Sequence, residues 1–479
     1  MNIFLPELTV LATGLIVLIY DLFAIKKDNS KFSTYFSLLG LILAFVLVAL
    51  GDSGQALGGR FAVEGIEPWF KLIFLGSSIL TLTFTAETFT SKAQEKLNHP
   101  AEFHTMMLFS ITGMMFLVSS RDLISLYVSL ELATIPLFLL AAWTKNIRSG
   151  EGSLKYLLSG ALASAILLYG FGLLYGLTGE MSLAQIGPKL TANPALWLAA
   201  GMVLAGVGFK LTLFPFHMWA PDTYESAPTS ITAFLSVASK AAGLALFFQL
   251  YYRVFSTHTL SFQFIISLFA AATMTLGNVV AIKQKNIKRF MAYSAISQAG
   301  YLMMGFLGTS HESTASIIFY LLVYALTNLT AFAVIVHHTH NQDDESIEGL
   351  RGLSLSHPIL ALIFMIALFG LAGIPPLSGF VGKFFLFSVA AKSGYYWLVT
   401  IAALNSTVSL YYYLRIIRQM YIEPLNPQEH PMKSSGLFKM GLGIGVLGSV
   451  VCGLIPMIYE HIDTNTIEWL STLHVLGMK

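Results

Sequence analysis

The sequence has very little cysteine and little charge. Of its 479 residues only Cys452 is a cysteine, and 11% are charged, whereas ordinary soluble domains have about 25% charged residues. A single cysteine excludes a disulfide framework and a cysteine-ligated metal cluster within the chain. The net charge of +2 at pH 7 provides no strongly basic surface for a nucleic-acid partner.

Motifs for nucleotide binding and for export are also absent. The sequence contains no Walker-type phosphate loop, so ATP does not drive this chain directly. No lysine or arginine precedes the first apolar run, from Leu8 to Phe23, although cleavable signal peptides begin with basic residues. We therefore interpret this run as a permanent first membrane helix.

What the sequence has in excess is apolar length. It is 55% hydrophobic, with a mean hydropathy of +0.71. A spanning helix needs roughly 20 apolar residues. The apolar runs predict an all-α polytopic membrane protein with about 14 transmembrane helices in a single membrane domain, residues 1–479. The expected spans are 3–25, 33–51, 69–90, 102–119, 122–143, 153–177, 195–217, 229–254, 260–282, 287–308, 313–338, 357–390, 395–421 and 437–458.

Lysine and arginine residues predict the orientation of these spans. With alternating spans, one set of connections holds 16 of these residues, and the other set, together with the termini, holds 7. The smaller set is Arg60, Lys71, Arg121, Lys189, Arg253, Lys392 and Lys479. Because positive residues concentrate on the cytoplasmic side, we expect both termini on the non-cytoplasmic side of the cell (inner) membrane.

Five ionisable residues lie inside apolar sequence. They are Glu131, Lys155, Lys210, Lys240 and Lys383. A charge at the membrane centre costs about 2.5–3.5 kcal/mol on insertion scales, so such groups are usually turned inward, paired or hydrated. One acid cannot neutralise four lysines. Some of these lysines must therefore be neutral part of the time, hydrated, or paired outside the chain.

Two interpretations of these residues remain open. An acid and a lysine can form a static bridge between helices, and Lys155 can reach the cytoplasmic interface beside Glu151. Alternatively, the five groups form a proton path. Movement of Glu131 toward or away from a lysine would then switch that lysine between holding and releasing a proton. We favour the proton path because all five groups occur in one chain.

Helix-breaking residues precede two of the lysines. Glycines at 206 and 208 precede Lys210, and Pro375 and Pro376 precede Lys383. Irregular backbone at membrane depth is tolerated where it is buried in protein or lines a wet cavity, although close helix packing also explains glycines. The two broken spans are the seventh and the twelfth, five apart. Spans 4–8 and 9–13 would therefore be two inverted five-helix repeats.

This plan divides the membrane domain into four segments. They are three leading helices in 1–100, the first repeat in 101–255, the second repeat in 256–422, and the final helix with the C-terminus in 423–479. His337, His338 and His340 stand at the end of a span beside three acidic residues. We interpret this cluster as a solvated cytoplasmic loop rather than a metal site, and we expect no metal and no cofactor bound by this chain.

One segment resembles a known family. Lys210-Leu-Thr-Leu-Phe-Pro-Phe-His-Met-Trp-Ala-Pro-Asp-Thr-Tyr-Glu-Ser-Ala-Pro-Thr-Ser230 closely resembles the signature of the antiporter-like membrane subunits of NADH–quinone oxidoreductase, respiratory complex I. The segments around Glu131, from Met291 to Tyr301 and from Gly373 to Lys383 resemble the family as well. The opening Leu5-Pro-Glu-Leu-Thr9, a lysine at 383 where M-type subunits usually have glutamate, and a chain that stops soon after the last span resemble subunit N.

The resemblance implies a proton-translocating membrane-arm subunit. In that family NAD, FMN, the iron–sulfur clusters and quinone are bound by partner subunits, so the redox centres would lie outside this chain. The implied partners are M-like and K-like membrane-arm neighbours and the lipid bilayer. The implied roles are a switching pair of Glu131 and Lys210, a central relay at Lys240, an exit or next-subunit position for Lys383, modulation of the inlet by Lys155, and a relay or packing role for His217.

Two other functions would fit the same sequence. A subunit of a multi-subunit sodium/proton antiporter or of a membrane-bound hydrogenase shares the fold and much of the signature, and neighbouring genes would separate these possibilities. A non-conducting structural scaffold of the membrane arm belongs to another class. In a scaffold, Glu131 and Lys210 would form a static bridge, and joint replacement by apolar residues would leave pumping intact.

Overall fold

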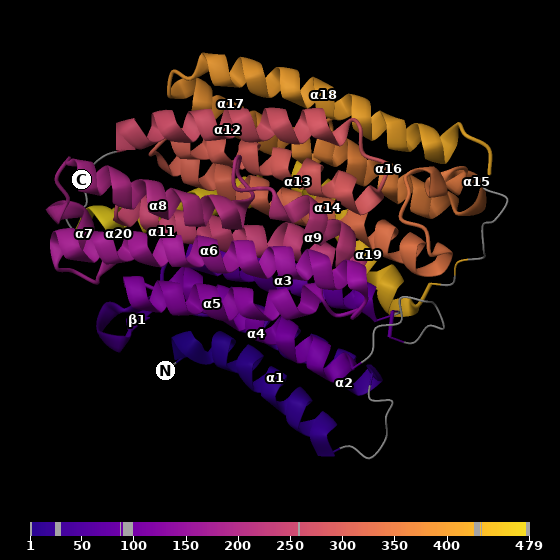
Figure 1. Ribbon diagram of the computed structural model, residues 1–479, viewed down its shortest axis with the longest axis horizontal. Coiled ribbons are helices and arrows are strands. Elements are labelled where there is room, and N and C mark those ends of the chain that lie inside the picture. Colours follow the sequence, from indigo (N-terminus) through magenta and orange to yellow (C-terminus); the bar gives the residue numbers. More distant parts are fainter. Residues whose placement is uncertain are drawn as a thin grey trace.

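The helices of the molecule lie side by side along its long axis (Figure 1). The computed structural model describes residues 2–23, 30–86, 88–89, 99–256, 259–425, 432 and 434–475. The hairpin β1–β2 and the short helix α7 lie at one end of the bundle, and α15 lies at the other (Figure 1). The helical, polytopic architecture predicted from the apolar runs is confirmed.

The leading segment comprises η1 (Asn2–Phe4), α1 (Leu5–Phe23), α2 (Ser30–Ala49), β1 (Gly54–Ala56), η2 (Leu57–Gly59), β2 (Phe61–Val63) and α3 (Glu67–Thr85). Strands β1 and β2 pair antiparallel, with Gly54 opposite Val63. The next segment comprises α4 (Pro100–Ser119), α5 (Leu123–Ala141), α6 (Ile147–Thr178), α7 (Leu183–Lys189), α8 (Pro194–Leu211), α9 (Trp219–Ser226), α10 (Thr229–Phe234), the π-helical turn η3 (Leu235–Ser239) and α11 (Lys240–Arg253).

The last segment begins with α12 (Thr259–Ala281), α13 (Ile287–Met303), η5 (Met304–Leu307), α14 (His311–Gln342), η6 (Glu348–Leu350) and α15 (Leu353–Ser356). It continues with α16 (Pro358–Ala372), α17 (Ser378–Lys392), α18 (Tyr396–Tyr421), α19 (Gly436–Leu454) and α20 (Met457–Val475). The centre of the bundle is formed by the continuous crossing α10–η3–α11 and by α14, which are the most buried of the long apolar helices.

Eleven helices in the described part of the chain are long and apolar enough to cross a membrane. Three of the fourteen expected spans, 287–308, 357–390 and 395–421, do not meet this standard. The first is a 17-residue helix, the second is divided into two helices of 15 residues, and the third has polar residues along its length. The count of fourteen stays a prediction.

Helix starts in the first half of the chain are fixed by side-chain caps. Asp122 accepts a hydrogen bond from the backbone N–H of Ser125 at the start of α5, and Asn193 does the same for Leu196 in α8. Asn146 and Ser149 form a capping box at the start of α6. Because such caps satisfy N–H groups that have no partner within the helix, they define where each crossing begins.

The seventh crossing is interrupted after Lys210 rather than at the glycines before it. Helix α8 runs without a break through positions 206, 208 and 210 and ends at Leu211. Thr212 then adopts a left-handed conformation with φ 58°. The two glycines instead permit close packing, because a Cβ at Gly206 would lie 2.6 Å from Leu167 of α6. The twelfth crossing is interrupted where expected, between Ala372 and Ser378.

Two of the isolated β-bridges lie at corresponding places in the two predicted repeats. One joins Asp122 to Ser182, and the other joins Asn286 to Ser346, so both have the same spacing of 60 residues. In each case the first residue caps a helix, since Asn286 accepts from two backbone N–H groups of α13. In the expected order of spans, the residues of the first bridge follow spans four and six, and the residues of the second bridge follow spans nine and eleven.

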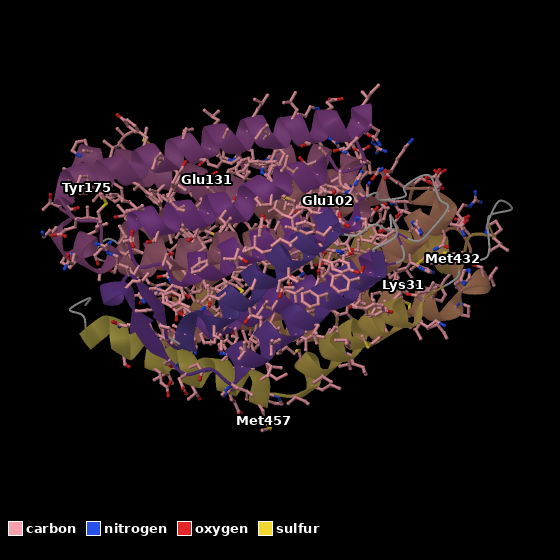
Figure 2. All side chains as sticks on the ribbon, turned by 90° about the horizontal axis from the view of Figure 1, so that it is seen from below. Lys31, Glu102, Glu131, Tyr175, Met432 and Met457 are labelled. Atoms are coloured by element: carbon pink, nitrogen blue, oxygen red, sulfur yellow. The ribbon has the colours of Figure 1, made fainter. Side chains whose placement is uncertain are left out.

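The last helix that is long and apolar enough to cross a membrane is α19, which ends at Leu454, within the predicted span of 437–458. Helix α20 follows after Ile455 and Pro456, and Figure 2 shows the ribbon turning from one helix into the other at Met457. The break lies beside the break of the twelfth crossing, because a Cβ at Gly453 would lie 2.6 Å from the backbone nitrogen of Ser378. The polar residues of α20 explain why hydropathy predicts only the first helix.

Candidate functional site

Glu131 and Lys210 line one cavity between α5, α6 and α8. The cavity has a volume of about 230 Å³ and is otherwise mostly apolar. Glu131 accepts a hydrogen bond from the hydroxyl of Ser164 on α6, which lies 3.0 Å from the hydroxyl of Tyr127. Figure 2 shows Glu131 well inside the length of the bundle, inward of Tyr175. The carboxylate therefore lies away from the end of the bundle, beside a space large enough for water.

Lys210 is directed toward a neutral partner rather than toward Glu131. Its Nζ donates to Thr134 Oγ1 over 2.7 Å, and Thr134 in turn donates to the carbonyl of Leu130. Only 4% of Lys210 is exposed. Within the described ranges, no ion pair shorter than 4.0 Å joins Lys210 to Glu131. The two groups share a cavity but remain separate in this conformation.

Lys240 begins α11 directly after the π-helical turn η3. Such turns widen a helix locally and often occur at functional sites. The side chain is 2% exposed, and its Nζ donates to the carbonyl of Ala295 on α13. Gly243, one turn later, lies against the stem of Lys210, because a Cβ there would lie 3.1 Å from Lys210 Cγ. Lys210 and Lys240 therefore lie on packed, adjacent helices.

Gln298 of α13 connects the neighbourhood of Lys240 with that of Lys383. Gln298 lies three residues after Ala295, which accepts from Lys240, and its Nε2 donates to the carbonyl of Leu371 over 3.0 Å. Lys383 donates to the same carbonyl over 3.1 Å. Gln298 also accepts from the hydroxyl of Tyr320 on α14. Gln298 therefore shares the Leu371 carbonyl with Lys383 and lies about one helical turn from the Ala295 carbonyl that receives Lys240, a placement that hydropathy did not identify.

Lys383 sits directly beneath the break between α16 and α17. It donates to the carbonyl of Ala372 over 3.0 Å, lies 3.4 Å from Ser406 Oγ, and its Nζ is 4.6 Å from the ring centroid of Tyr301. Gly373 has φ 84°, and a Cβ there would lie 3.0 Å from Lys383 Cδ. Only glycine adopts this conformation readily. The interruption therefore exposes carbonyl groups that receive the lysine.

The three central lysines share one property. Each is at most 4% exposed and donates to uncharged oxygens, and within the residues that the structure describes none has a carboxylate partner within 4.0 Å. A buried ammonium with neutral partners is poorly compensated, so its neutral form becomes accessible. This arrangement suits groups that change protonation.

Lys155 lies outside this row. It is 47% exposed and pairs with Glu151 over 2.8 Å and with Asp222 over 2.9 Å. This is the interfacial position that the alternative interpretation described. His217 is 4% exposed in the segment between α8 and α9, and its Nδ1 has no hydrogen-bond partner. Neither residue contacts a central lysine through a hydrogen bond among the described residues.

A cluster of ion pairs lies at the end of the bundle that bears Lys155. Arg289 binds Asp222 over 2.6 Å and Glu225 over 2.9 Å, and Arg148 binds Glu225 and Glu345 over 3.0 Å each. Burial opposes the charge of Asp222, but hydrogen bonds from Lys155 and Arg289 outweigh it. They lower the pKa of its carboxyl below the ordinary value of 3.8.

Glu345 is held ionised in the same way. Burial alone would raise the pKa of its carboxyl, but the charges of Lys288 and Arg148 lower it below the ordinary value of 4.5. Lys288 also donates to the carbonyl of Ala227 over 2.9 Å and is 1% exposed. Asp222 pairs with Lys155 and Arg289, a role that its position in the family-like segment from Lys210 to Ser230 did not indicate.

A second cluster lies at the opposite end, beside the β1–β2 hairpin. We call Glu64, Glu67, Arg121 and Arg253 the hairpin-end cluster. Arg121 binds Glu67 over 2.5 Å, and Arg253 lies 3.5 Å from Glu64. All four are at most 12% exposed. Lys71, which the sequence placed in the same connections, is a buried residue of α3.

The histidine cluster is not part of a loop. His337, His338 and His340 lie in the last turns of α14 and are 1%, 3% and 6% exposed. The loop interpretation was wrong because α14 continues four residues beyond the predicted end of the span. In the described part of the chain, no group of three or more histidine, cysteine, aspartate or glutamate residues could hold a metal ion.

The sequence is similar to those of known membrane proteins. The family model described as NADH:quinone oxidoreductase/Mrp antiporter, TM matches residues 120–409. Subunit N of NADH-quinone oxidoreductase from Dehalococcoides mccartyi is 37% identical over 476 residues, covering 95% of this chain and 97% of the relative.

Two solved structures show a similar fold. A chain of respiratory complex I from Thermus thermophilus with bound Aureothin is 31% identical, with a TM-score of 0.80, covering 94% of this chain and 97% of that chain. A chain of the Mrp complex from Dietzia sp. is 20% identical, with a TM-score of 0.85 and coverage of 99% and 98%. The second likeness concerns the fold alone.

Proposed function

This chain belongs to the family of NADH-quinone oxidoreductase subunit N, and on that basis we propose that it moves protons across the membrane while partner subunits transfer electrons from NADH to quinone. NAD, FMN, the iron–sulfur clusters and quinone would be bound by those partners. The proposed location is the cell inner membrane, with M-like and K-like subunits on either flank. Both termini would face the non-cytoplasmic side.

The observation that carries this proposal is the row of buried lysines with neutral partners. Quinone reduction elsewhere would shift the electrostatic balance along the membrane arm and move Glu131 across its cavity toward Lys210. Proximity of the carboxylate favours the ammonium form of Lys210, and withdrawal favours release of a proton. The proton would pass to Lys240 and, by way of the groups around Gln298, to Lys383.

The same proposal includes fourteen crossings, of which the fourth to eighth and the ninth to thirteenth form two inverted five-helix repeats. Equal spacing of the bridges Asp122–Ser182 and Asn286–Ser346 supports the repeat, and so do the interruptions of the seventh and twelfth crossings. An inverted pair of units places corresponding broken helices near the membrane centre, where coupling ions bind in many transporters.

The test replaces a central lysine in the complete complex. Lys210→Met and Lys383→Met keep most of the side-chain volume and remove the ionisable nitrogen. We expect quinone-linked proton pumping in vesicles to fall strongly for both variants while the complexes assemble. Lys189→Met is the matched control, because Lys189 is 52% exposed and pairs with Glu180 at the surface.

Two outcomes would contradict the proposal. If both central variants pump with the normal ratio of protons to electrons, the row of lysines carries no protons. If joint replacement of Glu131 and Lys210 by apolar residues leaves pumping intact, the scaffold function is correct instead.

A further inference from the structure

A large apolar cavity lies between α2, α3, α14 and α19, away from the central row of lysines. It has a volume of about 330 Å³, and its walls include Leu72 of α3 and Leu326 of α14. All four helices are long and apolar enough to cross a membrane. Two of the lining residues, Ile42 of α2 and Ile444 of α19, are each 48% exposed. The cavity therefore opens between α2 and α19 to the outer surface of the bundle.

The cavity is unsuited to water. Apart from the indole of Trp69 at one end, Ser77 is the only polar side chain among the described residues that line it, and its hydroxyl has no hydrogen-bond partner. A buried water needs two to four polar partners, whereas an apolar cavity of roughly 150 Å³ stays dry and binds benzene. The lining therefore suits hydrocarbon, which restores the dispersion contacts that an empty cavity lacks.

The mouth of the cavity is continuous with an apolar outer surface. Leu39 and Leu43 of α2 and Met440 and Leu447 of α19 are all more than half exposed. They lie within about one turn of the two exposed isoleucines at the mouth. Because the hydrocarbon region of a bilayer accepts apolar side chains without cost, this surface suits contact with lipid, and acyl chains are the molecules available at the mouth.

The length of the cavity matches one leaflet of a bilayer. Along α3 it extends from Trp69 to Leu80, a rise of about 17 Å at 1.5 Å per residue. The hydrocarbon core of a bilayer is about 30 Å thick, so each leaflet contributes about 15 Å. A membrane helix of a partner subunit would need a groove of the full thickness. The cavity therefore has the length for one acyl chain rather than for a helix.

Trp69 lies at the hairpin end of the cavity. It follows the start of α3 at Glu67 by two residues, and its ring centroid is 5.7 Å from that of His461 on α20, which is exposed. Tryptophan is enriched at the interface between membrane and water, where one part of its ring is apolar and another is polar. A lipid headgroup would therefore lie beside these two rings.

The cavity contacts one face of α14. That face consists of Leu322, Ala325, Leu326 and Leu329. Tyr324 and Asn328 lie on the opposite face of the helix, and both donate hydrogen bonds to Ser236 of η3, the π-helical turn that precedes Lys240. An occupant of the cavity would therefore support α14 from behind, on the side opposite to these hydrogen bonds.

We propose that this cavity binds one acyl chain of a phospholipid from the leaflet on the hairpin side, with the headgroup beside Trp69 and His461. The chain enters between Ile42 and Ile444 and packs along Leu326 of α14. A lipid molecule thereby becomes part of the packing around this helix. The inference depends on the location of the chain in a membrane and not on proton transfer.

The experiment uses the complete complex in lipid nanodiscs that contain phosphatidylethanolamine with a diazirine in one acyl chain. Irradiation attaches this probe to the side chains that it touches, and mass spectrometry of peptides locates the adducts. We expect adducts on residues 69–80 of α3 and 322–329 of α14, although most of both helices is buried. Adducts on the exposed face of α6 provide the internal reference.

The decisive variant is Gly76→Leu, which fills the cavity. Gly76 lines it, and among the described residues a Cβ there would meet only Phe45 Cε2, at 3.8 Å, so a larger side chain has room. We expect the adducts on α3 and α14 to fall several-fold relative to those on α6. Gly172→Leu is the matched control, because Gly172 is an exposed glycine of α6 and its Cβ would meet nothing within 4 Å. Ala325→Leu narrows the cavity from α14 and should give the same loss.

Two results would overturn the inference. If the adducts on α3 and α14 persist in both Gly76→Leu and Ala325→Leu, the probe reaches only the outer surface. If α6 alone is labelled in the unaltered complex, protein rather than lipid covers the mouth of the cavity. A Lys210→Met complex that pumps normally would contradict the proposed function instead and would leave the labelling unchanged.

Discussion

The central row of lysines and the hairpin-end cluster bury the same kinds of charge in opposite ways. Lys210, Lys240 and Lys383 donate to hydroxyl and carbonyl oxygens, whereas Arg121 and Arg253 face carboxylates. Buried charge pairs stay ionised, because each member compensates the other. A lysine among neutral oxygens loses little when its proton leaves. The partner, rather than the depth, decides whether a buried charge is fixed or exchangeable.

The largest expected effect comes from breaking the hairpin-end cluster. Arg121→Gln leaves the carboxylate of Glu67, which is 0% exposed, without its cation. Loss of one partner of a buried pair costs about 3–5 kcal/mol, so we expect a lower melting temperature and less assembled complex. Thermal unfolding in detergent measures the first, and quantitative native electrophoresis the second. The double variant Arg121→Gln with Glu67→Gln should recover most of the loss, and an equally unstable double variant would refute pairing as the cause.

The intermediate case is a central lysine. Lys240→Met removes a buried charge that has only a neutral partner, so we expect stability to stay unchanged or to rise. Proton pumping should fall nevertheless. Thermal unfolding and pumping are measured on the same preparation. A loss of stability as large as that of Arg121→Gln would erase the distinction between the two regions.

The smallest effect concerns the ion pairs at the opposite end. The pKa of Glu345 is below its ordinary value of 4.5, so its pairs contribute stability above pH 4.5 and lose it as the pH falls further. Glu345→Gln should therefore reduce stability near neutral pH, by less than Arg121→Gln does because Glu345 is 19% exposed, and flatten the decline of stability in acid. Unfolding at a series of pH values checks both. If the loss of stability at low pH is the same in Glu345→Gln as in the unaltered protein, other carboxylates cause that loss.

The central row could be predicted from the sequence, whereas the clusters at the ends could not. Lys210, Lys240 and Lys383 interrupt long apolar runs, so hydropathy alone identifies them as buried. Arg121 and Arg253 occur where runs end, and a charge at such a position is normally solvated. Their burial follows from the hairpin, from α20 and from loops folding over the helix ends, which are tertiary contacts without a local signal.

Glycine and proline differ in how well they predict where a helix is interrupted. The glycines before Lys210 lie within α8 and permit close packing. The interruption begins instead at Thr212, and threonine is not a residue type that predicts the end of a helix. The pair of prolines before Lys383 did mark an interruption, because proline lacks the N–H that a helix requires. Gln298 was overlooked because a single amide in an apolar helix changes hydropathy little.

The interruption between α16 and α17 and the bend between α19 and α20 have a mechanical consequence. The half-helices α16, α17, α19 and α20 all pack on α14, which runs unbroken for 32 residues, or about 48 Å at 1.5 Å per residue. Their breaks meet at one level, where Gly453 touches Ser378. On this side of the molecule, the unbroken helix α14 therefore supports two pairs of shorter helices, each of which is interrupted at the same level. A bend at that level would change the backbone mainly at the two interruptions, and Lys383 lies next to the interruption between α16 and α17.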